Sequence, residues 1–537
     1  MAVTKVLHKV KKGAKSRGQG SKTTQNPVAS CHKTRQKHPR TTHEGTVAEH
    51  DFEPRHLETL DRDLGRFSAL ERASGYIARP LVAPGIALVF ILLSGLAAAL
   101  IFGQTSTTLI VACAAAIGAY MALNIGANDV ANNMGPAVGA NALSMGGAIL
   151  IAAIFESAGA LIAGGDVVDT ISKGIVSPDS ISASGEFVWV MMAALLASAL
   201  WVNVATYIGA PVSTTHAVVG GVLGSGVIAA GMASVNWAMM GQIVASWVIS
   251  PALGGLAAAG FLWFIKARII YQDDKIAAAR TWVPVLIGVM SGTFAAYLAL
   301  KGLSNVVKIT MGSALLIGLA VGILTWLVMI PVIRRQSEGL ENRNKSLKVL
   351  FAIPLVVSAA LLSFAHGAND VANAVGPLAA IVEATSGNVG GAVRVPLWVM
   401  VIGAFGISFG LMLFGPHMIR MVGQQITKLN PMRAYCVSLS AAITVIIASW
   451  LGMPVSSTHI AIGAIFGVGF FREWDAERRL KTQLRQAEIP ALPPEERRRR
   501  KLVRRNHVLA IGAAWVVTVP ATGVLSALIF VVIRYIA

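Results

Sequence analysis

The chain has 537 residues, of which 55% are hydrophobic and only 13% are charged, whereas soluble domains carry about 25% charged residues. Together with a mean hydropathy of +0.65, this composition excludes an ordinary soluble enzyme. It predicts an all-α polytopic membrane protein, because apolar stretches of about 20 residues recur along most of the chain. Three cysteines, Cys31, Cys113 and Cys436, lack the spacing of a zinc site or a disulfide framework.

The formal net charge of +19 is concentrated in two segments. Residues 1–40 hold 11 Lys or Arg and no acid, and residues 472–505 hold 12 Lys or Arg against 6 acids, so together they carry 17 of the 19 charges. A nucleic-acid partner is not expected, because the first 40 residues contain no aromatic side chain. The pattern is typical of cytoplasmic segments that follow the positive-inside rule and touch anionic lipid.

The N-terminal tail lacks the apolar core of a secretory signal. We expect a multi-pass protein of the cell (plasma or inner) membrane with its N-terminus in the cytoplasm. The Arg- and Lys-rich, acid-free start of the tail also resembles an organellar transit peptide, so an organellar membrane stays open as the alternative.

Apolar segments alternate with polar connections from residue 81 onward. They give thirteen candidate spans, and hence an expectation of about 12–13 transmembrane segments. The candidates are 81–103, 107–125, 145–164, 186–208, 212–231, 236–265, 281–301, 309–333, 349–366, 396–415, 432–451, 455–471 and 507–535.

The charges of the connections predict a topology. Segments 266–280, 334–348 and 472–506 are positive and are expected in the cytoplasm with the N-terminal tail. Segment 165–185 is expected outside, because it carries three acids and one lysine. Its acids are Asp166, Asp169 and Asp179.

Two motifs occur twice in the chain. Gly126–Pro136 reads GANDVANNMGP and Gly367–Pro377 reads GANDVANAVGP, identical at nine of eleven positions. Pro211–His216 reads PVSTTH and Pro454–His459 reads PVSSTH, 85 and 87 residues after the start of the first motif. The same order and nearly the same spacing indicate two homologous halves.

Each half contains five spans, and an odd number of crossings places the second half upside down relative to the first. We therefore predict two inverted-topology five-span repeats with discontinuous helices, as in secondary transporters. The predicted parts are a basic, largely disordered cytoplasmic tail (1–79), an extra N-terminal span (80–105), the first repeat (106–265), two connecting spans with cytoplasmic loops (266–348), and the second repeat (349–537) with a basic cytoplasmic loop (472–506).

The first motif predicts a cation site. Carboxylates within a bilayer are costly and normally mark function, and Asp129 and Asp370 occupy the same place in the two copies. Because a proline follows each acid by seven residues, we expect an interrupted helix whose free carbonyls join the side-chain oxygens. The candidate ligands are Asn128, Asp129, Asn132, Asn369, Asp370 and Asn373. Asn-capped helix starts or polar contacts between helices are the structural alternative.

The second motif predicts an anion site. Proline and hydroxyl residues precede an apolar, Gly-rich segment, as at a helix N-terminus, where unpaired N–H groups and the helix dipole attract anions. Two such termini meeting near the midplane would surround a tetrahedral oxyanion without any Arg or Lys. The hydroxyl residues are Ser213, Thr214, Thr215, Ser456, Ser457 and Thr458. Ordinary N-capping is the alternative.

Three further polar residues belong to these apolar segments. His216 and His459 do not indicate a hydrolase, because a nucleophile elbow and a single site are both missing. We expect them to bond across helices or to orient the hydroxyl cluster. Glu156 breaks the repeat, since aligning Gly164 with Gly415 places Ile407 opposite it. It is a candidate coupling acid, or equally a buried, protonated structural residue.

The paired motifs closely resemble those of the PiT family of inorganic phosphate transporters, and the resemblance covers about residues 107–535. It implies symport of inorganic phosphate with sodium or protons, without a cofactor and without enzymatic activity. It assigns ion binding to the Asn-Asp pairs of the first motif, including sodium ligation by Asp129 and Asp370, and phosphate binding to the six hydroxyl residues.

Other assignments stay open at this stage. A sulfate permease of the same family is one, and an anion channel or a non-transporting membrane receptor or scaffold is another. A homo-oligomer is also compatible with the sequence. The lipid bilayer, phosphate and the coupling cation are the expected partners.

Overall fold

The structure, a computed structural model, describes residues 81–103, 105–178, 181, 184–210, 212–302, 309–386, 395–425, 429–486 and 505–536. The predicted tail 1–79, Pro211, Asp179 and much of the loop 472–506 lie outside these residues. Within the described ranges nearly every residue is helical, and β-structure is limited to an isolated antiparallel bridge between Val176 and Val235.

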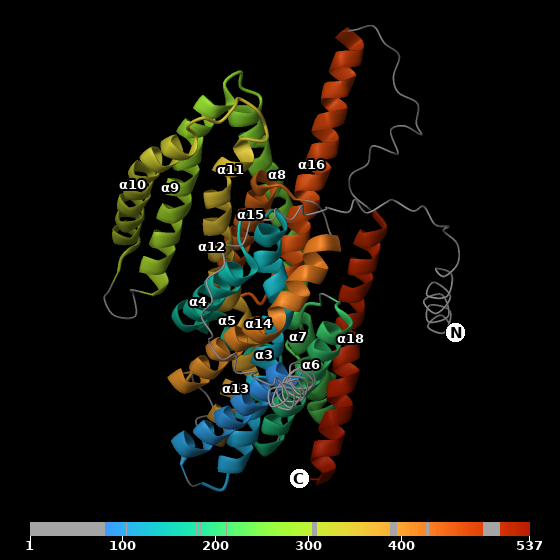
Figure 1. The fold of residues 1–537 in the computed structure, drawn as a ribbon. Coiled ribbons are helices and arrows are strands. Elements are labelled where there is room, and N and C mark those ends of the chain that lie inside the picture. Colours follow the sequence, from blue (N-terminus) through green and yellow to red (C-terminus); the bar gives the residue numbers. More distant parts are fainter. Residues whose placement is uncertain are drawn as a thin grey trace, which may run out of the picture. The chain divides into compact units, whose positions relative to one another are not determined.

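Figure 1 shows the helices of the described ranges in chain order. They are Leu81–Phe102, α3 (Thr108–Gly139), α4 (Met145–Ala163), α5 (Gly165–Asp169), η1 (Thr170–Gly174), α6 (Ser184–Ile208), α7 (Thr214–Ala230), η3 (Met232–Ser234), α8 (Trp237–Ile265), η4 (Lys266–Ile270), α9 (Lys275–Lys301), α10 (Met311–Gln336), α11 (Leu347–Leu350), α12 (Ala352–Asp370), α13 (Ala372–Thr385), α14 (Leu397–Gln425), α15 (Pro431–Trp450), α16 (Ser457–Gln486) and α18 (Arg505–Ile536).

Among the described residues, eleven helices are long and apolar enough to cross a membrane. The chain is a multi-pass, all-α membrane protein, as its composition predicts. Two of the thirteen candidate segments, 212–231 and 455–471, differ from the rest. The first forms α7, whose 17 residues span about 25 Å, less than the ~30 Å hydrocarbon core. The second forms only the first half of α16, which continues into a charged segment.

Both α7 and α16 begin after a break in the backbone. Gly209 and Gly452 have φ of +73° and +66°, left-handed values that glycine adopts without strain. At each, the next residue's N–H bonds to a carbonyl five residues earlier, from Ala210 to Ala205 and from Met453 to Ala448, which closes α6 and α15 with a Schellman-type turn. The predicted discontinuous helices therefore occur at the second motif of each half.

No comparable break occurs at the first motif. We expected an interruption near each aspartate, but α3 runs through GANDVAN without a break and includes Pro136. In the second half only Val371 separates α12 from α13. Proline removes one backbone donor, and the neighbouring helices that bury the motif allow the helix to continue past it.

Helices of the two halves pack in matching pairs. The helix that carries the first motif packs on the helix that follows this motif in the other half: α3 contacts α14, and α12 contacts α4. The two helices that begin at the second motif, α7 and α16, are called the half-helices here. Each packs on a helix of the other half, α7 on α18 and α16 on α8. Figure 1 shows α7 in green beside α18 in red. Each half therefore completes the packing of the other.

Two glycines of the first motif allow very close contacts between these helices. A Cβ on Gly126 would overlap the carbonyl oxygen of Ile407, and a Cβ on Gly367 would overlap that of Glu156. These are the first glycines of the two GANDVAN copies, so the contacts agree with the alignment that places Ile407 opposite Glu156. Glycine at these positions lets the backbones of the crossing helices touch.

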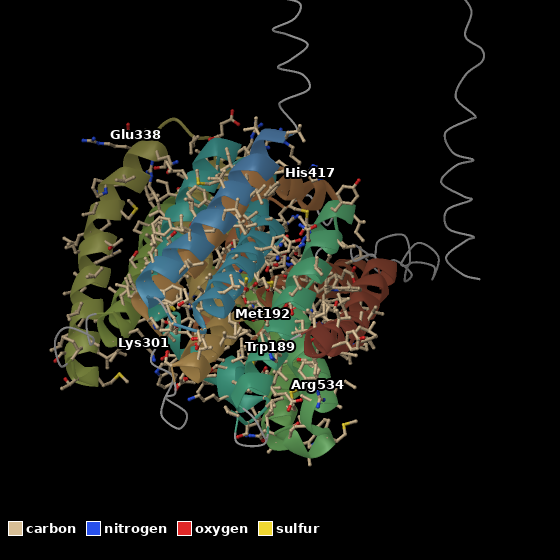
Figure 2. The ribbon with its side chains drawn as sticks, turned by 90° about the horizontal axis from the view of Figure 1, so that it is seen from below. Trp189, Met192, Lys301, Glu338, His417 and Arg534 are labelled. Carbon is tan, nitrogen blue, oxygen red and sulfur yellow. The ribbon has the colours of Figure 1, made fainter. Side chains whose placement is uncertain are left out.

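The ends of the helices carry ion pairs. Lys301 at the end of α9 pairs with Asp166 of α5. Figure 2 shows that Lys301 and Glu338, which lies just beyond α10, are at opposite ends of the α9–α10 pair. Lys266 of η4 pairs with Asp475 of α16 at 2.7 Å. The segments that begin at 266 and 472, both predicted to be cytoplasmic, therefore lie together.

Candidate functional site

The hydroxyl motifs form the N-termini of α7 and α16. Ser213 caps α7, its Oγ accepting a hydrogen bond from the His216 N–H at 3.1 Å, and Ser456 accepts the same bond from His459 at 3.3 Å. The N-capping that we considered as an alternative is thus present, but it uses only the first serine of each motif. The hydroxyls that follow are directed elsewhere.

Asp129 of α3 receives hydroxyl groups from both half-helices. Thr214 of α7 donates to Oδ2 at 3.1 Å, and Thr458 of α16 donates to Oδ1 at 2.9 Å. The Nδ2 group of Asn132, one helical turn away, donates to Oδ1 at 3.2 Å and to Thr458 at 2.8 Å. The first and second motifs therefore meet at one carboxylate.

Asp370 of α12 repeats this arrangement with the halves interchanged. Ser457 of α16 donates to its Oδ2 at 2.8 Å, and Thr215 of α7 lies at 3.4 Å from Oδ1. Asn373 donates to Oδ1 at 3.2 Å and also to Thr215. Each carboxylate thus lies next to one hydroxyl from its own half and one from the other, and the Thr215 hydroxyl also donates to the carbonyl of Val455 at 2.9 Å.

The first asparagine of each motif has a different position. Asn128 donates to Thr206 at 2.9 Å and to the carbonyl of Ala210 at 3.4 Å. Asn369 likewise donates to Ser449 at 3.0 Å and to the carbonyl of Met453. These amides hold the ends of α6 and α15 at the backbone breaks, and they support the site rather than bond to its carboxylates.

All twelve predicted site residues of the two motifs are buried. The largest exposed fraction of any of these residues is 7%, at Asn132. Unpaired carboxylates would be very costly at such depth. The donors around each aspartate offset part of that cost. The surrounding helices bury the whole cluster of oxygen atoms.

His366 is a central residue that sequence reasoning missed. Its Nε2 lies 2.8 Å from Oδ2 of Asp370 and 3.8 Å from Oδ2 of Asp129. Its Nδ1 lies 3.3 Å from Oε2 of Glu156, whose other oxygen accepts a hydrogen bond from Asn133 at 2.8 Å. The candidate coupling acid is therefore joined to the carboxylate pair through one imidazole.

The signal for these residues was the difference between the repeats. His366 precedes the second GANDVAN copy where Ile125 precedes the first, and Asn133 matches Ala374. Together with Glu156, they form a polar cluster that only one side of the pseudosymmetric site contains. Ligand atoms of Asp129, His366 and Asp370 lie within 4.8 Å of one another, close enough to share a cation.

The two motif histidines contact each other instead of the carboxylates. The rings of His216 and His459 meet edge to face with centroids 4.4 Å apart, and His216 also packs on Trp247 at 3.8 Å. The Trp247 indole N–H donates to the carbonyl of Pro454. The imidazoles thus join the starts of α7 and α16, and their role in orienting the hydroxyl cluster stays a prediction.

Comparison with known proteins gives the same family at the levels of sequence and structure. The model of the phosphate transporter family matches residues 125–526. A Helicobacter pylori protein named "Putative phosphate permease" is 44% identical, with 88% of this chain and 99% of the relative covered. A Pyrococcus abyssi relative, also named as a phosphate permease, is 38% identical over 77% of this chain and 95% of its own.

A solved structure, "The sodium-dependent phosphate transporter", is 33% identical, with a TM-score of 0.71, and covers 80% of this chain and 100% of that one. The members of the family and this structural neighbour are transporters, not enzymes. Since the family model spans most of the chain and includes all four motifs, the chain belongs to the phosphate transporter family.

Proposed function

We propose that the protein is a secondary-active symporter of inorganic phosphate, coupled to sodium or protons, with alternating access at a midplane site between two inverted repeats. One observation carries the proposal: the N-termini of α7 and α16 converge on the same pair of carboxylates, Asp129 and Asp370. Each terminus offers N–H groups and hydroxyls to an oxyanion, while the carboxylates offer oxygen to a cation.

Electrostatics supplies the coupling. A phosphate anion at the hydroxyls of Thr214 and Ser457 would lie next to two carboxylates, and like charges repel strongly where water is excluded. A cation bound at Asp129 and Asp370 removes that repulsion, so anion binding depends on cation binding. The sodium-dependent neighbour favours sodium, and the His366–Glu156 pair beside the aspartates provides the alternative, protonatable group.

The roles of the remaining residues follow from their positions. The N-termini of α7 and α16 are capped by Ser213 and Ser456. The hydroxyls are connected to the carboxylates by Asn132 and Asn373. The backbone breaks before the two helices are held by Asn128 and Asn369. In this proposal the phosphate contacts the hydroxyls and free N–H groups of α7 and α16, and a rigid movement of one repeat against the other opens the closed site to either side.

The orientation is part of the proposal. Segments 266–280 and 472–506 are joined through Lys266 and Asp475, and their excess of Lys and Arg favours the cytoplasmic side of a cell membrane for this end. Asp166 and Lys301 mark the outer end. The N-terminal tail would then be cytoplasmic.

The test is labelled phosphate uptake by purified protein in proteoliposomes under imposed sodium or proton gradients. One of the two gradients should drive accumulation, and preloaded unlabelled phosphate should accelerate labelled phosphate entry, as expected of a carrier but not of a channel. Asp129→Asn should abolish gradient-driven uptake, while the matched Asp273→Asn in an exposed loop should not. Uptake without dependence on either gradient, or without counterflow, would refute symport. A scaffold or receptor would give no uptake at all.

A further inference from the structure

A second polar site lies at the end of the molecule that holds Lys266 and Asp475. A pocket of about 410 Å³ is lined by the last turns of α8 and η4 and by the charged half of α16. It shares no residue with the buried carboxylate site, and the proposed transport of phosphate and cation does not use it.

The pocket concentrates positive charge around one satisfied carboxylate. Asp475 Oδ2 accepts hydrogen bonds from Lys266 at 2.7 Å and from the Tyr271 hydroxyl, and Arg479 Nε lies 3.5 Å from Oδ1. Burial and the bond to Asp475 raise the pKa of Tyr271 to about 12, so this phenol remains a neutral donor. With Arg478 also in the lining, three cations face one anion, and the side chains retain N–H groups for a further acceptor.

Aromatic side chains form the other walls. Trp263 and Trp474 are 59% and 53% exposed, Arg478 lies 5.4 Å from the Trp474 ring centroid, and Lys266 lies 5.2 Å from that of Phe471. Trp263 is within the last two turns of the membrane span Trp237–Ile270. Tryptophan beside Lys and Arg at a span end is typical of the membrane–water interface.

We propose that this pocket binds the phosphate headgroup of an anionic phospholipid. The cations and the arginine N–H groups match a phosphate ester, and the acyl chains would extend along the exposed face of α8, where Leu256 precedes Trp263 by seven residues and is 72% exposed. A soluble phosphate compound offers the same headgroup chemistry but would leave the tryptophans and this apolar face without contact.

Native mass spectrometry of the full-length, detergent-purified protein tests the proposal. Dioleoylphosphatidylglycerol should remain bound to the wild type, and Arg478→Gln should weaken its apparent affinity roughly tenfold, as expected for one lost charge-assisted bond to phosphate. The matched control is Arg335→Gln, an exposed arginine at the end of α10, which removes the same charge outside the pocket. Trp263→Ser should weaken the lipid but leave the unfolding temperature within the range of the control.

Three results would overturn the assignment. Equal lipid loss in Arg478→Gln and Arg335→Gln would reduce the effect to general charge. Equal retention of phosphatidylcholine and phosphatidylglycerol by the wild type would remove the anionic preference. Displacement of the lipid by an equal concentration of glycerol 1-phosphate or inorganic phosphate would assign the pocket to a soluble phosphate compound instead.

Discussion

The two aspartates have matching partners but differ in their distance from His366, and this difference predicts unequal effects of the same substitution. Asp129→Asn and Asp370→Asn both convert one carboxylate oxygen into an amide donor that faces existing donors. Both should abolish coupled uptake. Asp370 has the additional contact of His366 Nε2 at 2.8 Å, whereas the same atom is 3.8 Å from Asp129.

The size of the difference follows from that contact. A charge-assisted contact at 2.8 Å contributes about 1.5–3 kcal/mol, and a contact as long as 3.8 Å contributes little of this. The free energy of unfolding should therefore fall by about 1.5–3 kcal/mol more in Asp370→Asn than in Asp129→Asn. Denaturant unfolding of the purified variants in one detergent measures this quantity.

A double-mutant cycle identifies the contact responsible. His366→Gln combined with Asp370→Asn should be less destabilising than the sum of the single changes, whereas His366→Gln with Asp129→Asn should be nearly additive. Equal destabilisation by the two aspartate variants, or a larger coupling of His366 to Asp129 than to Asp370, would refute the reasoning from the distances.

Three other predictions concern packing, topology and specificity. Gly367→Ala should destabilise the protein and impair uptake, because the new methyl group meets the backbone of Glu156. The control Gly241→Ala, whose methyl group meets nothing within 4 Å, should do neither. Normal unfolding and uptake in Gly367→Ala would contradict the close helix crossing. Leu340→Cys should react only with reagents that reach the cytoplasm and Asp179→Cys only from outside, and labelling of both from one side would disprove the topology. A roughly tenfold excess of sulfate should leave phosphate uptake nearly unchanged, whereas arsenate should compete with phosphate. Phosphate and arsenate carry an O–H donor for the carboxylates, and sulfate at neutral pH does not. Strong competition by sulfate alone would indicate a sulfate permease.

The sequence predicted the features that the two repeats share. It did not predict the contacts that form between the repeats in the folded protein. Identical motifs predicted that Asp129 and Asp370 have equivalent surroundings, and composition predicted a multi-pass helical protein. The exchange of hydroxyls between the halves was not predictable in detail, because Thr458 reaches Asp129 from 329 residues away. The expected break at the first motif was wrong for α3, since proline is only a local signal and packing allowed the helix to continue.

His366 shows a different limit of sequence reasoning. A histidine next to a repeated motif carries no pattern of its own, and its importance appears only when α12 places it between three carboxyl groups. The same holds for Asn133, whose partner Glu156 lies on another helix. Departures from repeat identity were the available signal, and they mark the side of the site where the two halves differ.

The exchange of α7 and α18 has a consequence for how the protein is made. The backbone of Gly523 in α18 occupies the space that a side chain on Gly224 of α7 would need, so this face of α7 is complete only when the last helix has been synthesised. At about 5–20 residues per second, the intervening ~300 residues take roughly 15–60 s. During that time a short helix with a hydroxyl-rich start lies in the membrane without its final neighbour. Quality control by membrane proteases or insertion chaperones therefore has this interval in which to act on α7, and truncations just before α18 should be degraded rather than accumulate as stable fragments.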